Sequence, residues 1–328
     1  MSTFPATTFV NSGLNFQISG GFTMGSLAFD KNGNLFCTSH TNSILKITPS
    51  GTVSTFVNSG LNFGATTSQG YLAFDKKGNL FCSDNEKIVK ITPDGSVSTF
   101  VNEVVAAMLF DKNGIMFCTT STGNSIIKIT PSGSISTFVN SGLDTAAGLA
   151  FDRSGNLYCS DVGTGIDKIF KITPSGNMTE FASVDNLLGL MSDKNGNLYT
   201  GTMTTNKLFR ISTSGVVEEL ITTGATIDDI ESAVFDNRGN LYISNSGNDT
   251  IIKVALGVPS EFLVIATFLK KTGKGSFVNP TKQVTAFLES LPASEKNNTT
   301  LQSLILRYQN SREALMEIEK AFGVSIVG

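Results

Sequence analysis

Four cysteines are the strongest nucleophiles in this 328-residue sequence, and they recur at a regular spacing. Each ends a similar phrase (NLFC, NLFC, IMFC or NLYC), at positions Cys37, Cys82, Cys118 and Cys159. Equivalent positions in neighbouring packed sheets lie about 10 Å apart, whereas a disulfide needs Cα atoms within about 7 Å of each other. We therefore expect free, buried thiols that act as small hydrophobic side chains.

The other residue types do not point to nucleophilic catalysis. Such catalysis needs a nucleophile and a base held together, and the sequence identifies no such arrangement around its single histidine, His40. Serine and threonine occur in every predicted turn, so no hydroxyl is singled out. We expect His40 to be a surface or loop residue, and we predict no catalytic residue.

Two sets of charged residues recur once per repeat. The aspartates, called the anchor aspartates below, are Asp30, Asp75, Asp111, Asp152, Asp193 and Asp236. The cations are Lys46, Lys90, Lys128, Lys171, Arg210 and Lys253. The cations could form a basic ring that binds anions or RNA, or each could pair with a carboxylate such as an anchor aspartate. We favour the structural pairing because the two sets match in register, and breaking a buried pair is costly.

These residues belong to a repeated unit of three phrases. LAFDKNGNLFCTS (27–39) returns with variations up to VFDNRGNLYISN (234–245), and it is followed by phrases such as LKITPSG and VSTFVNSG. Each unit predicts four short strands, with a tight D-x-x-G turn between the first two. Six such antiparallel units, repeating every 36–45 residues, are typical of a β-propeller. We expect the variable, polar loops between the second and third strands to serve recognition, if they bind anything.

The N-terminal stretch TFVNSGLNF (8–16) returns unchanged at 55–63, where it ends a unit. The sixth unit has no clear copy of the fourth strand. We therefore predict that Thr7–Val10 supplies this strand and closes the ring, which would remove its exposed edges. Glu261–Ala266 is the competing candidate. The predicted fold is an all-β, six-bladed propeller closed by its N-terminal strand.

The pattern FD-x-x-GNLY, followed by a loop and K-I-T-P-x-G, resembles the NHL-repeat and SMP-30/gluconolactonase-like group of six-bladed propellers. The resemblance covers about residues 1–260. It implies the propeller fold, and it leaves function open because the group includes lactonases, esterases, lyases and interaction modules.

The resemblance also implies where a metal would lie. The group's metal-dependent lactonases hold a divalent cation, usually calcium, in the central channel through Glu, Asn and Asp at the starts of the innermost strands. Five residues before each anchor aspartate stand Gly25, Gly70, Ala106, Ala147, Leu188 and Glu231. Calcium needs six to eight oxygen ligands, and here only Glu231, with Asp228 and Asp229 nearby, offers carboxylates. We predict no cofactor, with calcium at these three residues as the alternative.

The repeat ends before about Leu269, which divides the chain into a propeller (1–268) and a linker with a helical segment (269–328). Thr281–Leu291 predicts a short helix, and residues from Thr299 to about Phe322 predict a longer one. The apolar face of the longer helix, predicted to bind a partner, consists of Leu301, Leu304, Ile305, Tyr308, Leu315 and Ile318. Two small helices bury little surface alone, so we expect them to pack on the propeller, on a second copy or on a partner protein.

Charge and hydropathy restrict location and partners. The net charge is -3 and the pI is near 5.3, which gives no general attraction to nucleic acid. The N-terminus has no secretory signal pattern, and no apolar run has the length of a membrane span. We expect a cytoplasmic or otherwise intracellular protein with no nucleic-acid or membrane partner.

The channel positions are mostly small or apolar, and no catalytic constellation is evident. We therefore predict a non-catalytic interaction or structural module, a rigid propeller joined to an assembly or oligomer through its C-terminal helices. The alternative is a metal-dependent lactonase or related hydrolase with a divalent cation in the central channel.

Overall fold

The computed structural model describes residues 3–16, 25–63, 70–163, 166–202 and 205–256. These residues form twenty-four β-strands and one 3-10 helix, η1 (Ser246–Asn248), so the described chain is all-β as predicted. None of its helices has the length and apolar character that crossing a membrane requires. The predicted C-terminal helices and the competing strand Glu261–Ala266 lie outside the described residues.

Four sheets each contain four consecutive antiparallel strands. The first sheet is β2 (Leu27–Phe29), β3 (Leu35–Ser39), β4 (Ser43–Ile47) and β5 (Val53–Val57). The second sheet is β6 (Leu72–Phe74), β7 (Leu80–Ser83), β8 (Ile88–Ile91) and β9 (Val97–Val101). The third sheet is β10 (Val105–Phe110), β11 (Met116–Thr120), β12 (Ile126–Ile129) and β13 (Ile135–Val139). The fourth sheet is β14 (Ala146–Phe151), β15 (Leu157–Asp161), β16 (Lys168–Ile172) and β17 (Met178–Ser183).

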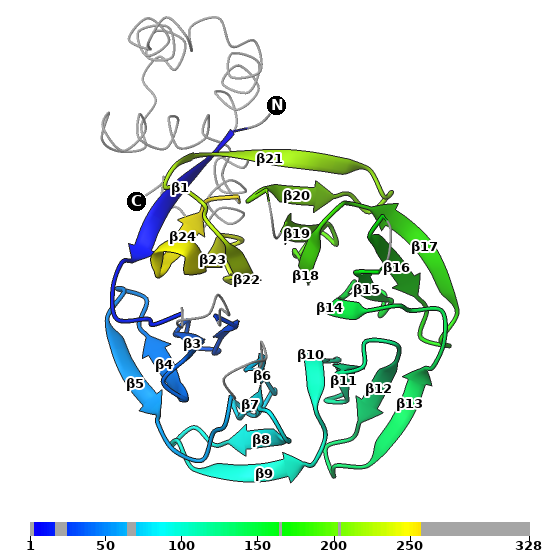
Figure 1. Cartoon of the computed structure of the whole chain (residues 1–328), viewed down its shortest axis with the longest axis horizontal. Helices are drawn as coiled ribbons and strands as arrows, with labels where there is room; N and C mark the ends of the chain where they lie inside the picture. The colour runs from blue at the N-terminus through cyan, green and yellow to red at the C-terminus, as the bar shows by residue number, and fades with distance from the viewer. Residues whose placement is uncertain (1–2, 17–24, 64–69, 164–165, 203–204, 257–328) are drawn as a thin grey trace, which may run out of the picture.

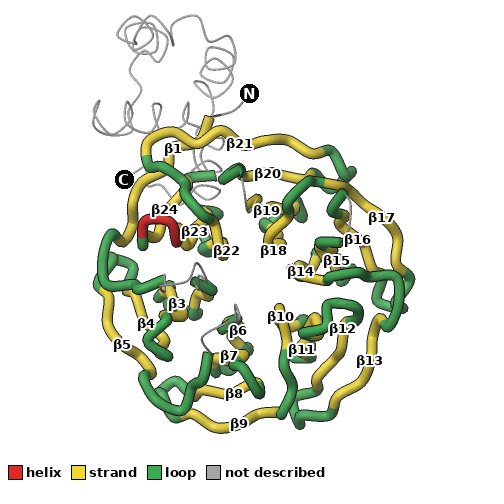
Figure 2. The backbone as a smooth tube through the Cα atoms, in the orientation of Figure 1, coloured by secondary structure: helices red, strands yellow, loops and turns green. Residues whose placement is uncertain are grey.

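The remaining strands form one eight-stranded sheet in two parts. One part is β18 (Leu187–Ser192), β19 (Leu198–Thr202), β20 (Leu208–Ile211) and β21 (Val217–Gly224). The other part is β22 (Ile230–Phe235), β23 (Leu241–Asn245), β24 (Thr250–Val254) and, from the other end of the sequence, β1 (Thr3–Val10). The sheets surround a central axis, with the first strand of each set innermost (Figure 2).

Strand β1 closes the ring in the way that the repeated nonamer predicts. It pairs antiparallel with β24, from Ala6 opposite Val254 to Val10 opposite Ile251. Its first half also pairs in parallel with β21, with Thr3 opposite Ile221. Figure 1 shows β1 between these two strands. The N-terminal strand therefore joins both parts of the eight-stranded sheet, which the sequence pattern did not predict.

A repeated aromatic contact packs most of the sheets against the next, except where Ser192 replaces the phenylalanine that precedes the anchor aspartate. Phe36 on β3 makes edge contacts with Phe56 of its own sheet and Phe74 of the next sheet, at centroid distances of 5.0 and 5.1 Å. Across the closure, Tyr242 contacts Phe9 and Phe29, both at 5.0 Å. Phe9 thus occupies the fourth-strand position of its set. Edge-to-face pairs of this kind stabilise packing beyond the area they bury.

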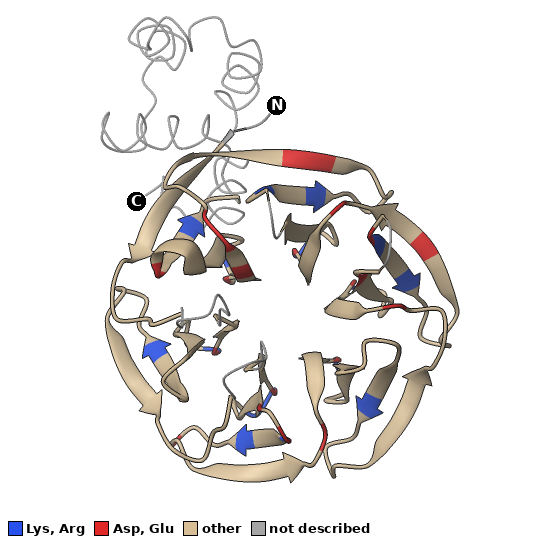
Figure 3. Ribbon diagram, viewed as in Figure 1, with Lys and Arg blue, Asp and Glu red and all other residues tan. Residues whose placement is uncertain are grey.

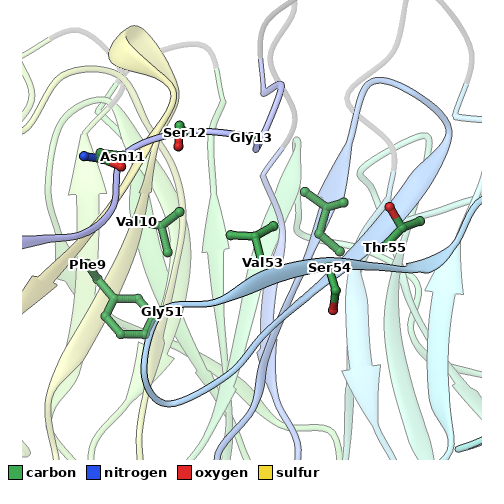
Figure 4. A pocket seen from close by; sticks show the side chains of 10 residues that line it. Phe9, Val10, Asn11, Ser12, Gly13, Gly51, Val53, Ser54 and Thr55 are labelled. Carbon is green, nitrogen blue, oxygen red and sulfur yellow. The ribbon is translucent and has the colours of Figure 1, made fainter.

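The outer edges of neighbouring sheets meet at a turn glycine. Gly51 has φ 86°, and a Cβ atom there would lie 3.2 Å from the carbonyl oxygen of Phe9. Both the positive φ and this close approach therefore favour glycine. The groove beside this contact, about 480 Å³ in volume, lies between the end of β1 and strand β5 (Figure 4). Gly95 approaches the carbonyl oxygen of Phe56 in the same way one sheet further on.

The anchor aspartates bind the turn that follows them. Asp30 Oδ1 accepts hydrogen bonds from the amides of Asn32 and Asn34, each at 2.8 Å, and its Oδ2 accepts from the side chain of Asn34 at 2.7 Å. The other five anchor aspartates accept from the residue four positions later in the same way. Their carboxylates are thus used within their own turns.

The expected pairing of the cation set with the anchor aspartates is therefore corrected. Figure 3 shows Lys or Arg on the third strand of each set. Among the described residues none of these cations forms an ion pair with an anchor aspartate; Arg210 pairs with Glu218. Each cation lies opposite the aromatic residue on the second strand of its own set. In addition, Lys128 Nζ lies 3.8 Å from the ring centroid of Phe138. Cation–π contacts are made by Lys46, Lys128, Lys171 and Lys253, whereas Arg210 has a carboxylate partner.

Candidate functional site

A cavity of about 350 Å³ lies among the innermost strands of the ring. The residues three and four positions before the anchor aspartates all line it, because these residues lie in or just before the innermost strands. Its wall is mainly aliphatic, with Leu72, Met108 and Leu190 as examples. Concave apolar sites with a few polar groups are where small molecules usually bind.

Two side chains break the repeat at the cavity wall. Five positions before the anchor, Glu231 stands where the other units carry Gly, Ala or Leu. Four positions before it, Tyr71 stands where the others carry Ser, Ala or Gly. A Cβ atom on Gly148, which shares the register of Tyr71, would lie 2.3 Å from the amide nitrogen of Leu190. Close strand packing therefore excludes a side chain there, whereas Tyr71 faces the cavity.

Glu231 is the one carboxylate among the described residues that line this cavity. Burial, assisted by the negative charge of Asp229, raises the pKa of its carboxyl from 4.5 to about 7. Desolvation acts against the charged form of an acid, and a like charge acts in the same direction. A carboxyl group with this pKa can both accept and donate a proton near neutral pH.

The neighbours Asp228 and Asp229 are held in the loop before β22. The amide of Asp228 donates to Asn245 Oδ1 at 2.6 Å. The carbonyl oxygen of Asp229 accepts from the hydroxyl of Ser246 at 2.8 Å. Across the described chain, no group of three or more His, Cys, Asp and Glu side chains is close enough to hold a metal ion.

Sequence reasoning missed Tyr71. Its side chain lines the cavity from the residue before β6, while Glu231 reaches the cavity from β22. Burial, together with the nearby charge of Glu231, raises the pKa of Tyr71 to about 12, so its hydroxyl remains a proton donor at neutral pH. The sequence signal that could have identified Tyr71 is an aromatic residue at a position where every other repeat carries a small residue.

Two serine hydroxyls of the cavity wall already serve the packing of neighbouring strands. The amide of Leu72 donates to Ser26 Oγ at 3.0 Å, and the amide of Leu27 donates to Ser232 Oγ at 3.3 Å. These bonds tie β22 to β2, and the start of β2 to β6. Much of the polar character of the wall is therefore used by the protein itself.

The other chemically active residues lie away from the cavity. The four cysteines are free and buried, as predicted, and burial raises the pKa of each thiol. They are thus poor nucleophiles. His40 lies in the turn after β3, as expected for a loop residue, and its amide donates to the carbonyl oxygen of Asn15. The groove beside Phe9 has no titratable side chain among its described lining residues.

The variable loops contain side chains that hold neighbouring units together. Asn42 Oδ1 accepts from the amide of Phe63 at 2.9 Å, and Asp167 Oδ2 accepts from the amide of Leu187 at 2.8 Å. At the ring closure, Asp249 accepts from Phe16 at 2.7 Å and from Asn15 at 3.1 Å. These loops, which we expected to serve recognition, thus contribute to the packing of the ring.

The fold defines the class of protein: a β-propeller that resembles the gluconolactonase-like, SMP-30-like propellers, as predicted. No protein-family model and no curated protein sequence matches the chain. Among solved structures, a gluconolactonase from Xanthomonas campestris is similar, with a TM-score of 0.60 and 18% identity over 76% of this chain and 89% of that one. At this identity the likeness establishes the fold alone.

Two further solved structures share this fold. Selenomethionine-substituted virginiamycin B lyase from Staphylococcus aureus has a TM-score of 0.55 and 20% identity over 73% of this chain and 82% of that one. The PQQ-bound aldose sugar dehydrogenase from Streptomyces coelicolor has a TM-score of 0.61 and 15% identity over 77% of this chain and 98% of that one.

These comparisons correct the predicted function. The similar structures are named as a gluconolactonase, a lyase and a dehydrogenase, and all three are enzymes. They favour the catalytic alternative over the predicted non-catalytic interaction or structural module, which is corrected accordingly, and they do not support the sequence's leaning against an enzyme. In the sequence Glu231 was considered only as a metal ligand, and Tyr71 was not singled out although both depart from the repeat pattern.

Proposed function

We propose that this protein is a hydrolase that opens a lactone or cleaves a related ester in the central cavity, with Glu231 as its general base. The observation that carries this proposal is the single carboxylate in an otherwise mainly apolar wall, with its pKa raised to about 7. The similarity in fold to a gluconolactonase supports the reaction class.

The reaction needs one proton-transfer group and one water molecule. The ionised Glu231 carboxylate removes a proton from water while the water oxygen attacks the carbonyl carbon of the ester. As the tetrahedral intermediate collapses, the bond to the ring oxygen breaks, and protonated Glu231 returns the proton to the departing oxygen. The product is a hydroxy acid, and Glu231 is regenerated. A positioned base of this kind contributes typically 10²–10⁴-fold to the rate.

Calcium, which the resemblance implies, does not fit the described donor set. Calcium takes six to eight oxygen ligands and usually several carboxylates, whereas Glu231 is the one carboxylate among the described lining residues. We therefore propose a hydrolase in which no step depends on calcium.

We further propose that the ring has six blades. The eight-stranded sheet then divides at the pair β21–β1, with β18 to β21 as one blade and β22 to β24 with β1 as another. The antiparallel pairing of β1 with β24, and the contact of Phe9 with Tyr242, support this division.

Hydrolysis of simple lactones, followed with a pH indicator, tests the proposed function. We expect turnover above the buffer rate, and we expect Glu231→Gln to lower kcat by at least about 10²-fold. As a matched control, Glu180→Gln removes a surface carboxylate whose side chain is 54% exposed, and it should leave the rate unchanged. Addition of EDTA should also leave the rate unchanged. Equal activity of the wild type and Glu231→Gln would overturn the proposal.

A further inference from the structure

We propose that the substrate carries an alkyl group rather than a polyhydroxylated ring, and that the Tyr71 hydroxyl donates a hydrogen bond to its carbonyl oxygen. This inference rests on the proposed function. It departs from the sugar substrates that the names of two similar structures indicate.

The wall of the cavity favours a substrate with an alkyl substituent over one that carries several hydroxyl groups. Its described aliphatic lining includes Leu27, Leu72, Met108, Leu149, Leu190 and Ile230. A sugar lactone would bring several hydroxyl groups to these side chains. Each hydroxyl group that enters an apolar site without a hydrogen-bond partner costs roughly 1–3 kcal/mol. An alkyl chain gains instead, by about 0.8 kcal/mol for each buried methylene.

Few polar groups of the described wall are available to a polyhydroxylated ligand. Ser26 Oγ and Ser232 Oγ each accept a hydrogen bond from a backbone amide of the neighbouring innermost strand. Tyr71, Thr145 and Glu231 are the other described lining residues with a polar side chain. Each serine keeps its hydroxyl proton for donation. This described set of polar side chains suits one ester group better than a ring that carries several hydroxyls.

Tyr71 has the chemistry and the position to donate a hydrogen bond to the substrate while Glu231 acts as the base. Both side chains line one cavity, and the Glu231 carboxylate is close enough to act on the ionisation of Tyr71. A phenol that keeps its proton can donate to the oxygen on which negative charge develops. Removal of one donor of this kind costs up to about 10²–10³ in kcat.

A pair of lactones with the same ring size tests the substrate class. We would measure kcat/KM of the full-length protein for δ-decanolactone and for D-glucono-δ-lactone. We expect δ-decanolactone to be preferred by at least about ten-fold. Preference for D-glucono-δ-lactone, with turnover that depends on Glu231, would overturn this inference and leave the proposed function standing. Turnover of neither compound above the buffer rate would overturn the proposed function itself.

The role of Tyr71 is tested by two Tyr→Phe variants. Tyr71→Phe should lower kcat for δ-decanolactone about 10–100-fold, with a smaller change in KM. Tyr242→Phe is the matched control, because Tyr242 packs between Phe9 and Phe29 away from the cavity lining and other repeats carry Phe at its position. Equal activity of the two variants, with unchanged melting temperatures, would overturn the assignment of Tyr71.

Discussion

At the scale of single residues, the position of Glu231 is unfavourable for its ionised form and useful for proton transfer. Its carboxyl lies in a mainly apolar cavity near Asp229, and both factors raise its pKa to about 7. The folded protein therefore holds a proton on Glu231 over a pH range in which the unfolded chain has lost it. The cost of ionising this buried group in the folded state is also what places its proton transfer near neutral pH.

This proton linkage predicts a pH-dependent stability difference between the wild type and Glu231→Gln. Between about pH 4.5 and 7, unfolding releases a proton from Glu231, so the free energy of unfolding of the wild type falls as pH rises. Glutamine cannot ionise. The variant should therefore gain stability relative to the wild type across this window, by on the order of 3 kcal/mol at pH 8. Urea unfolding at pH 4 and at pH 8 measures the difference, and an equal gain at both values would contradict the raised pKa.

At the scale of elements, β1 carries the closure of the ring. It supplies the outer strand of the set β22 to β24, and it also extends along β21. Phe9 on this strand reproduces the contact that Phe56 makes with Phe36, with centroid distances of 5.0 Å in both places. Asp249 holds the chain that follows β1 through the amides of Asn15 and Phe16. Strand β1 thus packs as the outer strand of an ordinary sheet does, together with this added polar contact.

Phe9→Ala and Phe56→Ala form a matched pair that tests whether β1 is as firmly held as an internal outer strand. Both side chains are partly buried and lose the same edge-to-face contact. We expect each substitution to lower the free energy of unfolding by about 2 kcal/mol. Urea unfolding at neutral pH measures both. A Phe9→Ala cost much smaller than that of Phe56→Ala would mean that the closing strand separates before the ring unfolds.

At the scale of the whole molecule, closure removes the free ends from which an open repeat array can unravel. In such arrays each repeat contacts only its neighbours, and unfolding can begin at an end. Here the first strand of the sequence pairs with the last described strand. The sheet formed by β2 to β5 is therefore not a free end of the array. We therefore expect the sheets to unfold together.

The four buried cysteines report on this cooperativity because they lie in four different sheets, on β3, β7, β11 and β15. Thiol labelling at increasing urea concentration should expose all of them at one midpoint. Phe9→Ala should lower that midpoint for all four cysteines together. Labelling of Cys37 at a clearly lower urea concentration than Cys118, read by mass spectrometry of peptides, would indicate an open array that frays from its first sheet.

Much of the fold could be predicted from the sequence, because the repeat encodes local structure six times. The D-x-x-G turn, the alternating third strand and the PSG turn each depend on contacts within a few residues, so one copy explains the others. The duplicated TFVNSGLNF also predicted where β1 pairs, since a strand with the same letters fits the same neighbours. The parallel contact of β1 with β21 was not predictable, because it joins residues more than two hundred positions apart without a pattern.

The sequence by itself determined the repeat, its strands and the partner of its N-terminal strand, and all of these depend on local propensity and periodic burial. The sequence also singled out Glu231, but only the tertiary structure joined it to Tyr71 in one candidate site. Glu231 and Tyr71 stand 160 positions apart in the sequence, and a closed ring is what brings both to one cavity. The raised pKa of Glu231 likewise depends on burial by strands from other repeats, because desolvation is a property of the assembled wall and not of a residue and its neighbours in sequence.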